Sequence, residues 1–160
     1  MVVRSKYFAI STVSLSISLL LASCNPSKQS QCEQLITAVN QGTILLDKNK
    51  GSQVTTSVQL ANDLQATSKK IQELNIQDPK LKRLQSDFAT NFRSLSQHIT
   101  KAAKALSTTK AAEANATGRS KIQQARNEID NSLKAAAIAA KKSDTLAVQL
   151  NKYCSQKVEK

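Results

Sequence analysis

An unbroken apolar stripe between residues 81 and 106 constrains the fold of this chain most strongly. Its apolar residues recur at steps of three and four, which is the spacing of one face of an α-helix. Asp78-Pro79 precedes the stripe and is typical of a helix start, with Asp as the N-cap and Pro at the first helical position. We therefore predict a long amphipathic helix that begins at Pro79 and ends between Ser107 and Ala114. The stripe consists of Leu81, Leu84, Phe88, Phe92, Leu95, Ile99, Ala102 and Leu106.

Three further segments show helical periodicity, and they cover residues 31–47, 52–74 and 119–155. Ser30-Gln31-Cys32-Glu33 fits a capping box at the start of the first segment, and Gly42 weakens the middle of that segment by about 1 kcal/mol relative to Ala. The chain has only three Gly and two Pro, which argues against a loop-rich β fold. We expect an all-α protein that folds as an up-down-up-down four-helix bundle.

The N-terminus has the features of a secretory signal peptide. Arg4 and Lys6 form a short basic segment, and a mainly apolar run of 15 residues, 7–21, follows it. This run is shorter and more polar than a membrane span, which needs roughly 20 mostly apolar residues. The sequence Leu21-Ala22-Ser23-Cys24 resembles the lipobox of bacterial lipoproteins, in which the Cys becomes the acylated first residue of the mature chain.

The lipobox resemblance implies a domain organisation and a location. Residues 1–23 are expected to form a signal peptide, residues 24–31 a lipidated tether and residues 32–157 the bundle. Fatty acyl chains such as palmitate at Cys24 imply a membrane-anchored lipoprotein that faces the periplasm or the cell exterior, because each buried CH₂ contributes about 0.8 kcal/mol to membrane binding. The alternatives are an ordinary signal peptide that is cut before a cysteine, and a permanent membrane span.

The two remaining cysteines limit the topology. Cys32 lies in the first turn of the first predicted helix, and Cys154 lies in the last turn of the last one. A disulfide requires Cα atoms within about 7 Å of each other. Four antiparallel helices bring these two turns to the same end, whereas three or five would separate them. Export also places the thiols in an oxidising compartment, so we expect a Cys32–Cys154 disulfide.

The chain is strongly basic. It has 23 Lys and Arg against 11 Asp and Glu, a net charge of +12, of which +10 remains after removal of residues 1–23. Aromatic residues make up 3% of the chain, so stacking on nucleic acid is not expected. Two interpretations stay open: a solvated Lys-rich surface, and a contact surface for anionic lipid or an acidic protein. The candidate basic surface comprises Lys69, Lys70, Lys80, Lys82, Arg83, Lys141 and Lys142.

No catalytic or cofactor-binding motif is recognisable in the sequence. His98 is the sole histidine, and two lone thiols beside one distant imidazole do not make a zinc set. The sequence contains neither a Gly-rich phosphate loop nor a Gly-x-Ser-x-Gly motif. We expect no enzyme, no catalytic residues, no metal site and no cofactor.

Two short segments resemble the small helical lipoproteins that are common in cyanobacteria. They are Leu74-Asn75-Ile76-Gln77-Asp78-Pro79-Lys80-Leu81 and Leu150-Asn151-Lys152-Tyr153-Cys154. The resemblance carries no activity to this chain. The expected function is therefore that of a membrane-tethered, non-enzymatic interaction or assembly module. A bundle that binds a small apolar ligand or pigment between its helices is the alternative, and an envelope enzyme is a remote one.

Overall fold

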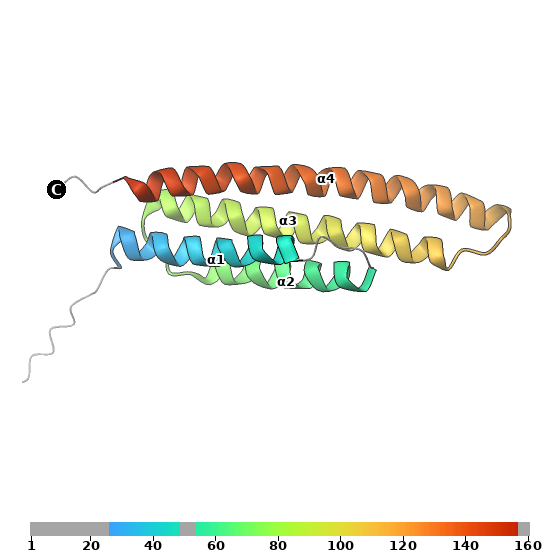
Figure 1. Ribbon diagram of the computed structural model, residues 1–160, viewed down its shortest axis with the longest axis horizontal. Coiled ribbons are helices and arrows are strands. Elements are labelled where there is room, and N and C mark those ends of the chain that lie inside the picture. Colours follow the sequence, from blue (N-terminus) through green and yellow to red (C-terminus); the bar gives the residue numbers. More distant parts are fainter. Residues whose placement is uncertain (1–25, 49–53, 157–160) are drawn as a thin grey trace, which may run out of the picture.

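Four α-helices make up the part of the chain that the computed structural model describes, residues 26–48 and 54–156. The helices are α1 (Lys28–Lys48), α2 (Val54–Glu73), α3 (Pro79–Lys110) and α4 (Ala116–Ser155). Each packs against the next along the chain, consistent with the predicted all-α, up-down bundle (Figure 1). The predicted signal peptide and Cys24 lie outside the described residues.

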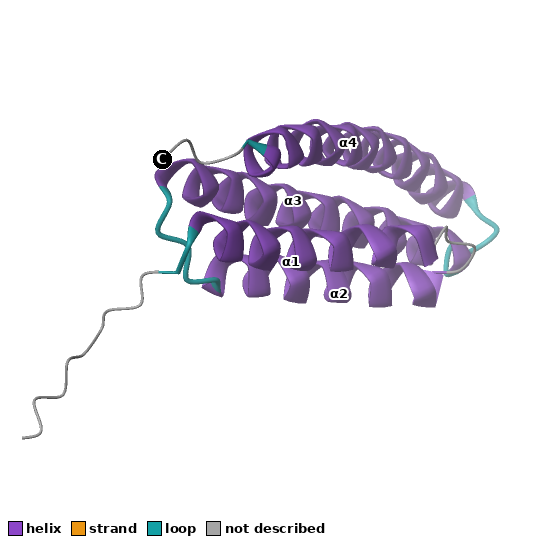
Figure 2. Cartoon of the chain, turned by 60° about the vertical axis from the view of Figure 1, so that its left-hand side comes forward, coloured by secondary structure: helices purple, strands orange, loops and turns teal. Residues whose placement is uncertain are grey.

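The helices differ in length, and this difference shapes the bundle. α3 and α4 have 32 and 40 residues, whereas α1 and α2 have 21 and 20. At 1.5 Å per residue, α4 is about 60 Å long and α1 about 32 Å. α3 is central and contacts the other three helices, whereas the described residues of α2 and α4 do not touch (Figure 2). The α3–α4 hairpin therefore extends beyond α1 and α2 at one end, which we call the hairpin end (Figure 1).

The predicted stripe of α3 lies at the centre of the core. Phe88 and Phe92 are fully buried, and their ring centroids are 6.3 Å apart. Leu35 of α1 and Leu64 of α2 are also fully buried in the same cluster. Leu106 departs from the prediction, because it is 39% exposed near the hairpin end. The apolar stripe of α3 thus continues further than the core does.

α1 begins earlier than the capping box predicted. The hydroxyl oxygen of Ser27 accepts a hydrogen bond of 3.1 Å from the N–H of Ser30, so Ser27 rather than Ser30 caps the helix. Residues 28–31, which we expected in the tether, form the first turn of α1. Both serines precede helix-forming residues, so sequence alone did not distinguish them. Of the expected tether, Pro26 and Ser27 are the described residues that precede the helix.

The starts of α3 and α4 are capped by acidic or amide side chains. Asp78 caps α3 as predicted and accepts a hydrogen bond of 2.8 Å from the N–H of Leu81. Asn115 caps α4, which therefore begins at residue 116 instead of near 119, and accepts from the N–H of Gly118 at 2.7 Å. A Cβ atom at Gly118 would overlap the carbonyl oxygen of Glu113. Glycine at this position therefore permits the tight turn between α3 and α4.

Buried serines fix the register of α2 against α3. Ser68 of α2 donates a hydrogen bond of 2.7 Å to the carbonyl oxygen of Ala89 of α3. Ser96 of α3 donates one of 2.6 Å to the carbonyl oxygen of Ala61 of α2. Each serine is at most 5% exposed, so both bonds form away from solvent. Sliding one helix along the other would leave these hydroxyl groups without partners, at a cost of about 1–3 kcal/mol for each group.

A buried asparagine joins α3 to α4. The side-chain amide of Asn91 donates to the carbonyl oxygen of Ala139 at 2.8 Å and to the hydroxyl oxygen of Ser143 at 2.6 Å. α4 continues without interruption through Ser143. The Ser143 hydroxyl thus acts as a hydrogen-bond partner between the two long helices.

Candidate functional site

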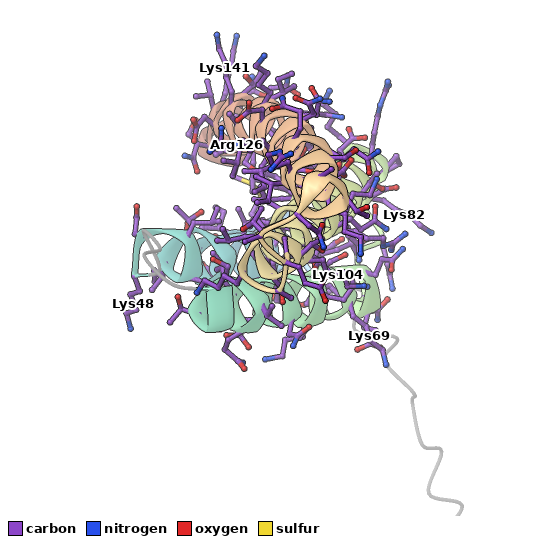
Figure 3. All side chains as sticks on the ribbon, turned by 90° about the vertical axis from the view of Figure 1, so that its right-hand side faces the viewer. Lys48, Lys69, Lys82, Lys104, Arg126 and Lys141 are labelled. Carbon is purple, nitrogen blue, oxygen red and sulfur yellow. A yellow bond between two sulfur atoms is a disulfide. The ribbon has the colours of Figure 1, made fainter. Side chains whose placement is uncertain are left out.

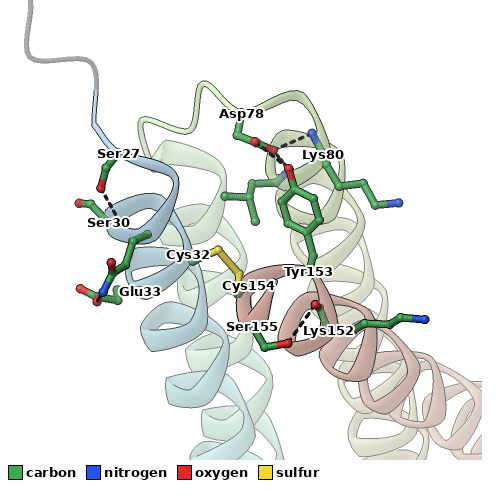
Figure 4. Close-up of a disulfide and its surroundings, with 12 residues drawn as sticks. Ser27, Ser30, Cys32, Glu33, Asp78, Lys80, Lys152, Tyr153, Cys154 and Ser155 are labelled. Atoms are coloured by element: carbon green, nitrogen blue, oxygen red, sulfur yellow. Dashed lines mark hydrogen bonds between the residues drawn. A yellow bond between two sulfur atoms is a disulfide. The ribbon is translucent and has the colours of Figure 1, made fainter. Parts of the chain in front are cut away.

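The first and last helices are joined by a disulfide at the end opposite the hairpin end, which we call the disulfide end. Cys32 of α1 and Cys154 of α4 form this disulfide, and their Cα atoms are 5.8 Å apart (Figure 4). Cys32 is 4% exposed. The predicted disulfide is therefore confirmed, and with it the inference that four antiparallel helices bring both cysteines to one end.

Gln31, directly before Cys32, ties the start of α1 to the turn between α2 and α3. Its side chain is 4% exposed. The amide nitrogen donates to the carbonyl oxygen of Pro26 at 2.7 Å. The amide oxygen accepts from the backbone N–H groups of Gln77 at 2.6 Å and Asp78 at 2.9 Å. One glutamine thus links the segment that enters α1 with the segment that enters α3.

Tyr153 provides a second link across the disulfide end. Its hydroxyl group donates a hydrogen bond of 2.8 Å to the Oδ2 atom of Asp78 (Figure 4). The ammonium group of Lys28 lies 4.0 Å from the centroid of the Tyr153 ring, within the range of a cation–π interaction. Together these contacts connect α1, the start of α3 and the last turn of α4.

The ionisation of Asp78 and Tyr153 follows from this arrangement. Burial acts to raise the pKa of Asp78, but hydrogen bonds from Leu81, Tyr153 and Lys80, with the charge of Lys28, outweigh it and lower this pKa. Burial raises the pKa of Tyr153, and the hydrogen bond to the Asp78 carboxylate and its negative charge raise it further. Around neutral pH Asp78 is therefore an ionised carboxylate, and it accepts a hydrogen bond from the protonated hydroxyl group of Tyr153.

The chain leaves the bundle from a fixed position at this end. Pro26 is the first described residue and lies two residues after Cys24. Its carbonyl oxygen is held by Gln31, and α1 begins two residues later. Two residues of backbone span at most about 7 Å, so any group attached to Cys24 joins the chain within that distance of Pro26.

The predicted basic surface is not one patch. Five of its residues lie near the disulfide end, in the last turns of α2 and the first turns of α3, and two lie midway along α4. Figure 3 shows Lys69, Lys82 and Lys141 pointing away from the bundle in different directions. Lys69 is also 3.8 Å from Glu73 in an exposed ion pair. The full set is Lys69, Lys70, Lys80, Lys82, Arg83, Lys141 and Lys142.

Surface hollows lie between neighbouring helices. One of about 600 Å³ lies between α1 and α2 and includes Glu33, Lys70 and Leu74 in its lining. Another, of about 430 Å³, lies between α3 and α4 near the hairpin end, where Lys104 and Lys121 line it. Within residues 26–48 and 54–156 no group of three or more His, Cys, Asp or Glu is placed to hold a metal ion.

None of the four described helices combines the length and the apolar character that crossing a membrane requires. Comparisons with known protein families, curated proteins and solved structures gave no match to the chain. Function is therefore inferred from the sequence and the geometry of this chain.

Proposed function

We propose that the protein is a lipid-anchored, non-enzymatic interaction or assembly module on the extracytoplasmic side of a bacterial membrane. The observation that carries the proposal is the position of the helix start: α1 begins four residues after Cys24, at the end of the bundle that the disulfide closes. An acyl anchor at Cys24 holds that end close to the lipid surface. The hairpin end is then the end that is free to meet other molecules.

The rigid connection at the disulfide end supports this arrangement. Gln31 holds the segment at Pro26, and the disulfide passes the connection from α1 to α4, which is about 60 Å long. An anchor that enters a well-packed end orients the whole bundle, whereas an anchor on a long flexible linker does not. The lipobox resemblance and the extracytoplasmic disulfide are consistent with each other, because disulfides persist in oxidising compartments.

The polar side chains of the disulfide end support a structural role for that end. Gln31, Asp78 and Tyr153 direct their polar atoms to partners within the bundle. The alternative function, an apolar ligand held between the helices, requires space in the core. At the centre of the described core that space is filled by Phe88 and Phe92, which are fully buried. We therefore favour the interaction module.

The anchor is tested by Cys24→Ala in the full chain. The native protein is expected in the membrane fraction, with an intact mass that includes acyl chains. The variant is expected as an unprocessed precursor or in the soluble fraction. The control is Cys32→Ser combined with Cys154→Ser, which removes the disulfide and leaves the anchor. A processed native protein without acyl mass, or a cleaved Cys24→Ala protein that stays in the membrane, would contradict the proposal.

A further inference from the structure

Among the residues that the structure describes, an apolar face on the α3–α4 hairpin is only partly covered. It consists of Ile99 and Leu106 of α3 with Ile122, Ile129 and Leu133 of α4, and we call it the hairpin face. Leu106 is 39% and Leu133 is 53% exposed, and the three isoleucines are half-buried. At 100° per residue, the three α4 residues fall within an arc of about 40°. They therefore form one stripe on the surface of α4.

The same side of the hairpin is covered by α1 in the other half of the bundle. On α4, the stripe continues through Ala147 to Cys154, which is bonded to Cys32 of α1. On α3, the stripe that carries Leu106 includes Phe92, whose ring lies directly against Gly42 of α1. The hairpin face is thus the continuation of the surface on which α1 packs.

α1 is too short to reach the hairpin face. It ends six residues after Gly42, at Lys48, which is about 9 Å further along the bundle. Leu106 lies 14 residues, or about 21 Å, beyond Phe92. The end of α1 therefore falls about 12 Å short of Leu106. Leu133 lies 21 residues, or about 31 Å, from Cys154, whereas Lys48 lies 16 residues, or about 24 Å, from Cys32, so α1 also ends short of Leu133. Both leucines are exposed.

Two basic side chains border the hairpin face. Arg126 is exposed and lies about 40° from Ile122 around α4. Lys110 follows Leu106 by one turn of α3. Not every basic side chain of this half borders the face. Lys101 and Lys104 point about 140–160° away from Leu106 and line, with Lys121, the separate hollow between α3 and α4.

We propose that the hairpin face binds an acidic amphipathic helix of a partner protein, in the position that α1 occupies in the other half. A face shared by two antiparallel helices fits a third helix, because the side-chain ridges of one pack into the grooves of the others. From Ile122 to Leu133 the face is about 17 Å long, which matches about three helical turns. The proposal rests on the interaction-module function and names the partner and the site.

The charge decides among the possible occupants. A second copy of the chain would place two positively charged faces against each other, which costs association energy, whereas acidic flanks on the incoming helix complement Lys110 and Arg126. An anionic lipid surface also offers negative charge, but the hairpin end is the end remote from the start of α1, which follows the proposed anchor, and the field of head groups fades within about 8 Å at physiological salt.

The test uses the native acylated protein in mild detergent and a synthetic 18-residue helical peptide with leucines at steps of three and four and glutamates elsewhere. Fluorescence anisotropy of the labelled peptide should show saturable binding that weakens as salt rises. The same peptide with lysine in place of glutamate should not bind. Leu133→Ser and Arg126→Glu should each weaken the affinity by about tenfold, the size of a typical important interface contact.

The matched control is Ile138→Ser, on the same helix. Ile138 is 72% exposed but points about 140° away from Leu133, so its replacement should leave peptide binding unchanged. Leu133, Arg126 and Ile138 are all exposed, so the variants should keep their helical circular dichroism and melting temperature. Equal binding of both peptides, or an equal loss in Ile138→Ser, overturns the proposal.

Two further measurements identify a different occupant. A dimer in sedimentation that Leu133→Ser dissociates would replace the partner helix with a second copy. Displacement of the peptide by phosphatidylglycerol vesicles, dependent on Arg126, would replace it with a lipid surface. The anchor is measured separately by intact mass, so an acylated protein that fails to bind the acidic peptide refutes the hairpin-face proposal alone. An unacylated protein that still binds the peptide refutes only the anchor.

Discussion

Replacing Gly42 with alanine should destabilise the protein, although the same replacement in an ordinary helix is stabilising. A Cβ atom built on Gly42 would lie 2.6 Å from the Cζ atom of Phe92 and 2.9 Å from its Cε1 atom. Phe92 is fully buried and packs beside Phe88, so its ring has no free space into which to rotate. α1 must therefore move outward, or the ring must leave its preferred position.

The magnitude follows from two opposing terms. Alanine in place of glycine within a helix gains about 1 kcal/mol of stability from helix propensity. Forcing an extra methyl group into a well-packed core costs about 1–3 kcal/mol. Gly42→Ala should therefore lower the free energy of unfolding by up to about 2 kcal/mol. For a domain of this size, that loss corresponds to a fall in melting temperature of up to about 8 °C.

A double-mutant cycle in urea separates the two terms. In a Phe92→Leu background the methyl group should find room, and Gly42→Ala should become stabilising by about 1 kcal/mol. Thr43→Ala is the neighbouring control, because Thr43 is exposed: its replacement changes helix propensity and removes only a long hydrogen bond of 3.4 Å to the carbonyl oxygen of Val39. If Gly42→Ala raises the stability of the native protein as much as it does that of the Phe92→Leu variant, the close packing of α1 on Phe92 is refuted.

Three more predictions concern the disulfide end. Reducing the Cys32–Cys154 disulfide opens a closed loop of 123 residues. On the chain-entropy account this loop contributes about 4–5 kcal/mol to stability, so the melting temperature should fall by about 10 °C or more. Free thiols in the native exported protein would contradict the prediction. Because the folded-state pKa of Asp78 is lowered, its contribution to stability is present above about pH 4 and is lost as pH falls through the folded pKa. The free energy of unfolding, measured by denaturation at pH values from 7 to 2, should show this loss in the native protein and not in Asp78→Asn. Tyr153→Phe removes the hydrogen bond to that carboxylate and should cost about 1–2 kcal/mol at pH 7, and an unchanged urea midpoint would refute the link.

Helical periodicity and cysteine placement were sufficient to predict the fold class and the disulfide. The stripe of α3 was predictable because apolar residues at steps of three and four place one face of a helix against a core. The disulfide was predictable because only an even number of antiparallel helices brings Cys32 and Cys154 to the same end. Both inferences use local geometry that does not depend on which side chain meets which.

Contacts between distant side chains were not predictable. Gln31 sits among polar residues and carries no pattern that distinguishes a buried amide from a solvated one, yet its bonds reach Gln77 and Asp78. Gly42 looked like a weak point of a helix and is a packing site for Phe92. Ser68 is small and polar in the sequence, and only its position opposite Ala89 makes it a buried link.

Helix length explains why the core prediction failed near the hairpin end. An apolar stripe shows which face of a helix is apolar, but it does not show whether another helix is long enough to cover that face. The predicted segments 31–47 and 119–155 already differed by 20 residues, or about 30 Å of helix, so part of the last helix had to extend beyond the first one. The apolar stripe of α3 nevertheless continues through Leu106 and that of α4 through Leu133, where α1 does not reach. Comparing the length of each stripe with the length of the helices available to cover it therefore locates, from sequence, the apolar surface that α1 does not cover.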